Sequence, residues 1–307
     1  MVQEKWIIHP GEARVIDVAD IARLKVGLAA GQVDIIGHDD DHVRVEVHEV
    51  AVKDLRIDIS GDELEIDHPQ VRWDNFLTAF RNFGSSGPRA EISIAVPRET
   101  RLTLGVVSAG ALVAGLEADA TINTVSGDVL VDGLVGSLST HGVSGDVQVR
   151  GLRGPFSSDM VSGDVAVSGE VVRTDVNTVS GAVFIDATGP LQKAALNTVS
   201  GAATLRLDRG YPANYAIRTV GGRVHIDGVA HGSSYTGSAG ELSGMFADVR
   251  INTVGGAITV LRSGDQPAAS DVDGEVVWPS ENRTADTVEV PRDVAERGSD
   301  GEGEERA

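Results

Sequence analysis

Residues 123–169 read NTVSGDVLVDGLVGSLSTHGVSGDVQVRGLRGPFSSDMVSGDVAVSG, and the five residues Val-Ser-Gly-Asp-Val begin at Val125, Val143 and Val161. A shorter signature, Val-Ser/Gly-Gly/Ala, extends this series to eight positions: Val107, Val125, Val143, Val161, Val179, Val199, Val220 and Val254. The intervals between them are 18, 18, 18, 18, 20, 21 and 34 residues. A fixed period of this length is typical of a repeat architecture in which each unit packs only on its neighbours.

Alignment of the repeats on this signature produces three columns of mostly apolar residues. They are Leu104, Ile122, Thr140, Ser158, Val176, Leu196, Ile217 and Ile251; then Val129, Val147, Val165, Val183, Ala203, Val224 and Ile258; then Val131, Val149, Val167, Ile185, Leu205, Ile226 and Val260. Alternation with a period of two predicts strands with one buried face. If the repeats stack, each valine lies about 4.8 Å from its counterpart, which is the spacing of hydrogen-bonded strands. The sequence therefore predicts an all-β fold, a single-chain β-solenoid that resembles a parallel β-helix, with coils of about 18 residues.

Glycine and polar residues form two more columns beside the signature. The glycine column is Gly127, Gly145, Gly163, Gly181 and Gly201, and it predicts a repeated corner that uses positive φ angles. The polar column is Asn123, His141, Asp159, Asn177, Asn197, Arg218 and Asn252. Stacked asparagines can exchange amide hydrogen bonds along the solenoid axis, so we interpret this ladder as structural, with a binding surface as the alternative.

The chain divides into three sections. Residues 1–97 are rich in alternating segments with a less regular repeat, and residues 98–262 form the regular solenoid. Residues 263–307 are expected to be a disordered acidic tail, since 13 acidic and 4 basic residues from Gly264 onward give a net charge of −9. The tail is either a solubilising appendage or a docking segment, and the insertion at 228–250 is either a loop or a degenerate coil.

Aromatic residues gather in the segment 71–83, VRWDNFLTAFRNF, where they recur at helical spacing. One interpretation is a cap, because the open end of a solenoid is an unpaired strand edge. The alternative is an exposed apolar stripe that binds a protein partner or a membrane surface. The candidate partner-binding residues are accordingly Trp73, Phe76, Phe80 and Phe83.

Bulk composition excludes several classes of function. A formal net charge of −20 argues against nucleic acid as a ligand, because affinity for a phosphate backbone depends on Lys and Arg. No stretch approaches the roughly 18 apolar residues of a membrane span, and the N-terminal residues lack a signal-peptide pattern. We therefore expect no integral membrane segment and a cytoplasmic location. The absence of cysteine excludes disulfides and thiolate sites.

Two groups of acidic residues are candidates for binding a cation. Asp128, Asp146 and Asp164 stack beside the corner, but Val-Ser-Gly-Asp-Val lacks the glycine pair of calcium-binding nonapeptides. Residues 38–42, His-Asp-Asp-Asp-His, contain ligand residue types that alternate in direction along a strand. We expect a solvated turn in the first case and a charged turn in the second. Neither a nucleophile elbow nor a P-loop occurs, so the sequence predicts no catalytic, cofactor-binding or metal-binding residue.

The repeats NTVSGDVLVDG, DMVSGDVAVSG, NTVSGAVFID and NTVSGAATLRL resemble the bacterial β-strand-repeat family labelled "putative adhesin", which is related to toast-rack-like β-solenoid domains. The likeness spans roughly residues 14–262. The resemblance implies a right-handed single-chain β-solenoid of unknown function, and some family members suggest envelope-stress roles. This chain departs from the adhesin label because no export signal or anchor is visible, and no residue role carries over.

These observations favour a non-enzymatic scaffold or protein-interaction protein without a cofactor. It would bind an unknown protein partner along a solenoid face or through the segment 71–83. One alternative is bactofilin-like self-assembly into a homo-oligomer through the solenoid ends, because matching coil ends can pair as strands. A further alternative is a carbohydrate-binding or carbohydrate-processing β-helix, which predicts a groove of clustered carboxylates.

Overall fold

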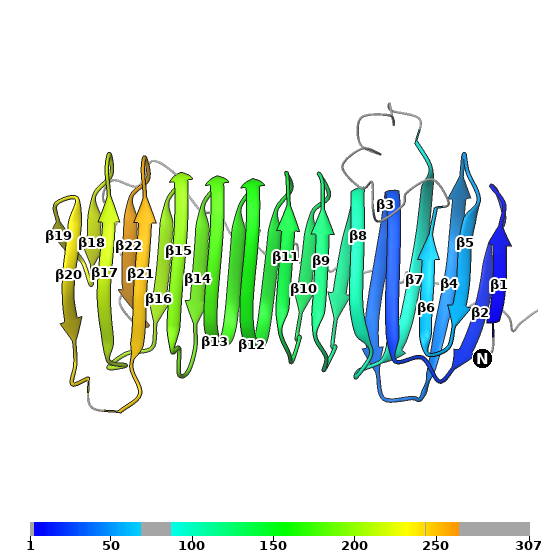
Figure 1. Ribbon diagram of the computed structural model, residues 1–307, viewed down its shortest axis with the longest axis horizontal. Coiled ribbons are helices and arrows are strands. Elements are labelled where there is room, and N and C mark those ends of the chain that lie inside the picture. Colours follow the sequence, from blue (N-terminus) through cyan, green and yellow to red (C-terminus); the bar gives the residue numbers. More distant parts are fainter. Residues whose placement is uncertain (1–2, 69–86, 243, 264–307) are drawn as a thin grey trace, which may run out of the picture. The chain divides into compact units, whose positions relative to one another are not determined.

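The computed structural model describes residues 3–68, 87–242 and 244–263, which belong to one compact unit. These residues consist of strands and turns, and Figure 1 shows the strands stacked side by side. The predicted all-β solenoid is confirmed. The segment with Trp73, Phe76, Phe80 and Phe83 and the expected tail from Gly264 onward lie outside the described residues.

The middle of the stack consists of regular coils around a shared core. Its strands are β9 (Ala120–Thr124), β10 (Val129–Asp132), β11 (Leu138–Gly142), β12 (Val147–Ser162), β13 (Val165–Ser180), β14 (Val183–Ala187), β15 (Lys193–Ser200) and β16 (Ala203–Leu207). Each coil has either one strand on each side or, for β12 and β13, one long strand that covers both sides. All their pairings with one another are parallel. Val129 pairs with Val147, and both side chains are buried, which confirms that equivalent residues stack.

Two polar residues interrupt the first apolar column, and they satisfy each other. Thr140 and Ser158 are each 1% exposed, and the Thr140 hydroxyl donates a hydrogen bond to the Ser158 hydroxyl at 2.8 Å. An unpaired hydroxyl at this depth would cost stability. Because the two residues occupy the same column in adjacent coils, stacking itself provides the partner.

The corner glycines are required for two different reasons. Gly181 has a φ of +130°, as the sequence predicted for this column. Gly127 and Gly201 have no positive φ, so the prediction was wrong for these two positions. A Cβ atom at either one would lie 1.9 Å from a carbonyl oxygen of the adjacent coil, that of Ala109 for Gly127 and that of Gly181 for Gly201. At these two positions the constraint is the close approach of the adjacent coil, and not the backbone conformation.

The N-terminal strands do not stack in chain order. They are β1 (Gln3–Ile8), β2 (Arg14–Ala19), β3 (Arg23–His38), β4 (His42–Ala51), β5 (Leu55–Ser60), β6 (Glu63–Asp67), β7 (Arg89–Pro97) and β8 (Arg101–Ala114). The long strand β3 forms a complete coil that pairs in parallel with β8 on one side and with β6 and β7 on the other. Beyond β6 and β7, the stack continues through the antiparallel strands β5 and β4 to β1 and β2. Strands β1 to β7 and the regular coils thus share one continuous sheet.

The C-terminal coils also depart from chain order, which corrects the alignment above. The strands are β17 (Ala213–Thr219), β18 (Val224–Ile226), β19 (Val229–His231), β20 (Ser234–Ala239), β21 (Ala247–Thr253) and β22 (Ile258–Arg262). The last coil, β21 and β22, lies between the coil of β15 and β16 and the coil of β17 and β18. The segment 228–250 is neither a plain loop nor a further parallel coil, since β19 and β20 pair antiparallel with β18 and β17.

A buried arginine joins the inserted coil to its outer neighbour. Arg262 is 8% exposed, and its Nη2 donates a hydrogen bond to the Tyr215 hydroxyl at 2.6 Å. Its Nη1 donates to the carbonyl oxygen of Tyr211, and its Nε lies 3.6 Å from a carboxylate oxygen of Asp227. A guanidinium with this many partners can be buried without leaving its charge uncompensated. The network therefore holds the last coil against the coil of β17 and β18.

Replacement of Gly201 by alanine tests the close approach at the corner. We expect Gly201→Ala to lower the free energy of unfolding by about 2–4 kcal/mol, because two stacked coils must separate to admit the methyl group. Gly232→Ala is the matched control, since a Cβ there meets nothing within 4 Å. Urea denaturation of both variants measures the difference, and equal stabilities would contradict the steric account.

Candidate functional site

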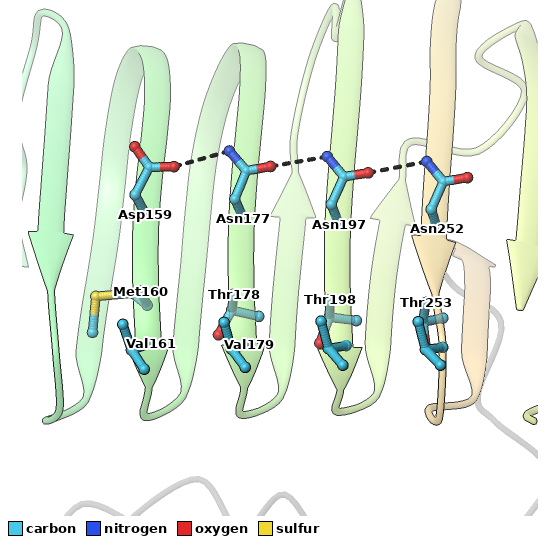
Figure 2. Close-up of a pocket in the computed structure, with 12 residues that line it drawn as sticks. Asp159, Met160, Val161, Asn177, Thr178, Val179, Asn197, Thr198, Asn252 and Thr253 are labelled. Atoms are coloured by element: carbon cyan, nitrogen blue, oxygen red, sulfur yellow. Dashed lines mark hydrogen bonds between the residues drawn. The ribbon is translucent and has the colours of Figure 1, made fainter.

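A ladder of polar side chains crosses four adjacent coils on the face formed by β12, β13, β15 and β21 (Figure 2). Asn177 Nδ2 donates a hydrogen bond to Asp159 Oδ1 at 2.9 Å, and Asn197 Nδ2 donates to Asn177 Oδ1 at 2.9 Å. Asn252 Nδ2 then donates to Asn197 Oδ1 at 3.0 Å. The predicted exchange of amide hydrogen bonds is confirmed for these residues. The order is corrected, because Asn252 and not Arg218 follows Asn197.

A row of exposed valines runs beside the ladder, two residues further along each strand. Val161, Val179, Val199 and Val254 are each 48–51% exposed. We call these four residues the valine ridge. Together with the ladder it borders a groove of about 430 Å³ that is lined by Asp159, Met160, Val161, Asn177, Thr178, Val179, Asn197, Thr198, Val199, Asn252, Thr253 and Val254. We call this the amide–valine groove.

The groove can offer both apolar contact and hydrogen bonds. Asn197 and Asn252 each use one amide hydrogen on the neighbouring coil and retain a second, whereas Asn177 Nδ2 also donates to Asp175 Oδ1 at 3.4 Å. Each amide oxygen has two lone pairs. The threonines between the asparagines and the valines point inward and are at most 5% exposed. Asp159 is the one ionisable residue that lines the groove, and its other carboxylate oxygen lies 3.3 Å from His141 Nδ1.

Exposure of the signature valine is confined to part of the stack. At the other end of the same column, Ala29, Val107 and Val125 are buried at 2–5% exposure and form a small cluster of their own. Val143 is intermediate at 37%. The same repeated residue is therefore buried beside the N-terminal coils and exposed beside the C-terminal coils, so the groove has a defined position along the solenoid.

The stacked aspartates bind the backbone of neighbouring coils. Asp128 Oδ1 accepts the N–H of Asp146 at 3.0 Å, and Asp146 Oδ1 accepts the N–H of Asp164 at 2.9 Å. Asp164 Oδ1 accepts the N–H of Ala182 at 2.7 Å. The expected solvated turn is therefore incomplete as a description. One oxygen of each carboxylate accepts a hydrogen bond from the backbone of the next coil and so joins two coils. The column ends at Ala182, whose N–H donates to Asp164 but whose side chain has no oxygen to accept a hydrogen bond from the next coil.

The run from His38 to His42 also has internal partners. The guanidinium of Arg98 donates a hydrogen bond from Nε to Asp39 Oδ1 at 2.6 Å, and it holds the pKa of that carboxyl below its usual value. His38 Nδ1 accepts the backbone N–H of Asp40 at 3.0 Å. Within residues 3–68, 87–242 and 244–263, no group of three or more His, Asp or Glu residues is arranged to hold a metal ion.

A second depression lies at the opposite corner of the coils, with a volume of about 420 Å³. Its lining includes Gly133, Gly151 and Gly169 and three charged residues, Glu117, Arg153 and Glu170. The charged groups of Arg153 and Glu170 already pair at 3.8 Å, and the three glycines give no side chain with which to recognise a ligand. The amide–valine groove is therefore the better candidate site.

The sequence prediction missed the valine ridge. The four candidate partner-binding aromatics lie outside the described residues, whereas the valines were treated as a marker of the repeat. The signal was present in Asn-Thr-Val, since a buried threonine places the asparagine before it and the valine after it on the outer face. The sequence did predict the position of the amide column. It interpreted that column as structural, with a binding surface as the alternative.

Comparisons with known proteins place the repeats in a family. The family model described as Toastrack DUF4097 matches residues 21–261. This chain belongs to the Toastrack DUF4097 family. The assignment confirms the family resemblance seen in the repeats. Within the part of the chain that the structure describes, no helical segment could span a bilayer.

Three solved structures are similar to this Toastrack chain. A "putative cell adhesion protein" from Clostridium sporogenes is 14% identical, with 85% of this chain and 99% of that chain covered and a TM-score of 0.27. A "putative lipid binding protein" from Parabacteroides distasonis is 16% identical, with 81% and 96% covered and a TM-score of 0.44. A "putative adhesin" from Bacteroides fragilis is 10% identical, with 82% and 97% covered and a TM-score of 0.32. No curated protein matches the chain, and none of these names assigns a ligand to it.

Asp164→Ala tests the role of the stacked aspartates. We expect the free energy of unfolding to fall by about 1 kcal/mol, because the N–H of Ala182 loses its carboxylate acceptor. Asp41→Ala is the control, since its side chain is fully exposed. Calcium or a chelator should leave the melting temperature of all three proteins unchanged. A calcium-dependent rise that disappears in Asp164→Ala would instead reveal a cation site.

A buried histidine gives the unfolding of this protein a defined dependence on pH. His68 is 0% exposed, its Nδ1 donates to the carbonyl oxygen of Asp54 at 3.2 Å, and its Nε2 has no partner among the described residues. Burial lowers the pKa of His68 below its ordinary value. As pH falls through about 6.5, His68 becomes protonated in the unfolded chain but stays neutral in the folded chain. The free energy of unfolding therefore decreases.

His68→Gln should remove this part of the pH dependence. We expect the free energy of unfolding of the unmodified protein to fall more steeply than that of His68→Gln between about pH 7.5 and pH 5.5. His9→Gln serves as the opposite control, because a hydrogen bond to Asp54 raises the pKa of exposed His9. Urea titrations across this range measure both slopes. Parallel profiles for the unmodified protein and His68→Gln would contradict a neutral buried His68.

Proposed function

We propose that this Toastrack chain is a non-enzymatic interaction scaffold, and that the amide–valine groove is its contact surface. The observation that carries the proposal is the valine ridge, in which four aligned side chains are each about half exposed. Apolar residues gathered in a row on the surface are typical of interaction sites, whereas isolated exposed valines are common. The adjacent amides would supply directional hydrogen bonds to the same partner.

The chemistry of the groove supports binding rather than catalysis. Carbohydrate processing on a β-helix would use two carboxylates at a defined separation, whereas Asp159 is the single carboxylate in this lining. Asp159 accepts a hydrogen bond from Asn177 and lies beside His141, so it acts as the end of the ladder. The family membership supports the same proposal without adding a specific role. An adhesin-like or envelope-stress role would use the groove as its contact surface.

Self-assembly through the solenoid ends is a second candidate function. Strands β1 and β2 at one end and β19 and β20 at the other each pair with a strand on one side only. Unpaired edges of this kind are templates for strand addition from another molecule. Light scattering separates this candidate from a groove contact, because end-to-end growth continues with concentration whereas a groove contact saturates.

Photo-crosslinking in the native cell tests the proposed contact surface. A photoreactive residue at position 199, in the centre of the valine ridge, should form adducts with a partner protein on illumination. The matched control is the same residue at position 150, since Arg150 is exposed in the half of β12 that pairs with β10, whereas the groove residues of β12 lie in the half that pairs with β11. Adducts at 199 but not at 150 support the groove. Equal labelling at both positions, or none at 199, would contradict it.

A further inference from the structure

We propose that the partner of the amide–valine groove is a second copy of this chain, packed face to face with its solenoid axis antiparallel. The two-fold axis would run along β15 (Lys193–Ser200), in the plane between the two copies. Each residue then faces a residue of the same column, at an equal distance on the other side of β15. The inference rests on the proposed function, because it names the occupant of the same surface.

The spacing of the groove favours a partner with the same repeat. Equivalent amides and valines recur on successive hydrogen-bonded strands, about 4.8 Å apart. An extended peptide laid along the ridge repeats at about 6.6–6.8 Å per two residues, so its contacts would fall out of register after two coils. A second stack of coils has the same period throughout. Stacked columns of identical side chains, asparagine ladders among them, also interdigitate in the dry contacts between paired sheets.

The two columns of the groove are complementary to themselves under this rotation. The amide column runs Asp159, Asn177, Asn197, Asn252 and Arg218 across successive coils. Rotation about β15 places Asn197 on its own equivalent, Asn177 opposite Asn252, and Asp159 opposite Arg218. In the valine column, the exposed valines extend through Val220, which is 75% exposed. The same rotation pairs Val161 with Val220 and Val179 with Val254.

Two further columns of the same face show the same charge complementarity. The next column runs Ser157, Asp175, Ala195, Arg250 and Ala216, so Asp175 would face Arg250 of the other copy. The column beyond it contains Arg173, Lys193 and Asp248, so Arg173 would face Asp248. Three columns thus place opposite charges at mirrored positions about one strand. Two of these columns also share an ion pair within the chain, since Arg250 Nη2 lies 2.9 Å from Asp248 Oδ2. Lys193 lies on the axis, and its ammonium already pairs with Asp175 at 3.8 Å.

The charge of this face also differs from that of the whole chain. The columns above contain three acidic side chains (Asp159, Asp175 and Asp248) and four basic ones (Arg173, Lys193, Arg218 and Arg250). The complete chain has 46 acidic and 26 basic residues. Two copies would repel each other through most of their surfaces, because like net charges oppose association. On this face the numbers of acidic and basic side chains are nearly equal, so two copies would repel each other less here than elsewhere.

The dimensions of the patch predict a weak, reversible dimer. Four columns about 6.7 Å apart and five coils about 4.8 Å apart enclose roughly 400 Å², about half of what each partner buries in a standard interface. Complementary exposed charges supply specificity and are screened by salt. We therefore expect self-association at micromolar concentrations that weakens as ionic strength rises.

Opposite charge reversals give a decisive test by sedimentation equilibrium. Asp175→Arg places arginine opposite Arg250 of the other copy, and Arg250→Asp places aspartate opposite Asp175, so each variant alone should dimerise at least about tenfold more weakly. An equimolar mixture restores both opposite-charge contacts, so heterodimers should form within about threefold of the original affinity. Within one chain the two positions are two coils apart, which limits their direct coupling. Arg150→Asp, in the half of β12 that pairs with β10 and not in the proposed contact face, is the control and should dimerise normally.

Circular dichroism and melting temperatures establish that each variant is folded. If either reversal prevents folding, Arg218→Glu replaces it, since Arg218 has no ion-pair partner among the described residues and the change places like charges opposite Asp159. A chain that stays monomeric at about 300 µM in low salt overturns the second copy as partner. Reversals that dimerise normally, or a mixture that forms no heterodimer, overturn it as well. Adducts of position 199 with a different protein would then leave the proposed function standing.

Discussion

The structure depends on the approach of successive coils to the distance of hydrogen-bonded strands, even at the corners where the chain reverses. At Gly201 there is no room for one additional carbon atom between a coil and the one before it. The close approach holds equivalent residues in register, so hydroxyls, amides and carboxylates of one column can bond to each other or to the next backbone. The interior and the surface therefore follow from the same constraint.

The repeat made much of this architecture predictable. Identical signatures at equal intervals fixed which residues stack, and the contacts between Val129 and Val147 and between Asn177 and Asn197 follow directly. The order of the last coils was not predictable in the same way. Ala203 meets Ile258, and Val224 lies beyond it, although either residue would fill the same apolar column. Column chemistry specifies what a coil packs against, but it does not distinguish one similar coil from another.

The signal for the candidate site was weaker than the signal for the core. Exposed valines are not unusual singly, and the signature valine is buried in Val107 and Val125 but half exposed in Val179 and Val199. Only the structure shows where along the stack that change occurs. The arrangement of charges on the same face could not be read from the sequence either, since Asp175 and Arg250 are separated by 75 residues in the chain. Their relation depends on the inserted coil, and no local sequence pattern contains it.

The inserted coil has a consequence for how the protein is made. Strand β17 (Ala213–Thr219) leaves the ribosome before β21 (Ala247–Thr253), yet in the finished stack β17 rests on β21. The outer coil must therefore wait undocked, or dock on β15 first and later give way, until the final strands emerge. Synthesis from the N-terminus can assemble the earlier coils one by one. Completion of the C-terminal end is therefore the last step of assembly, and it is the step most exposed to exchange of coils between nascent chains.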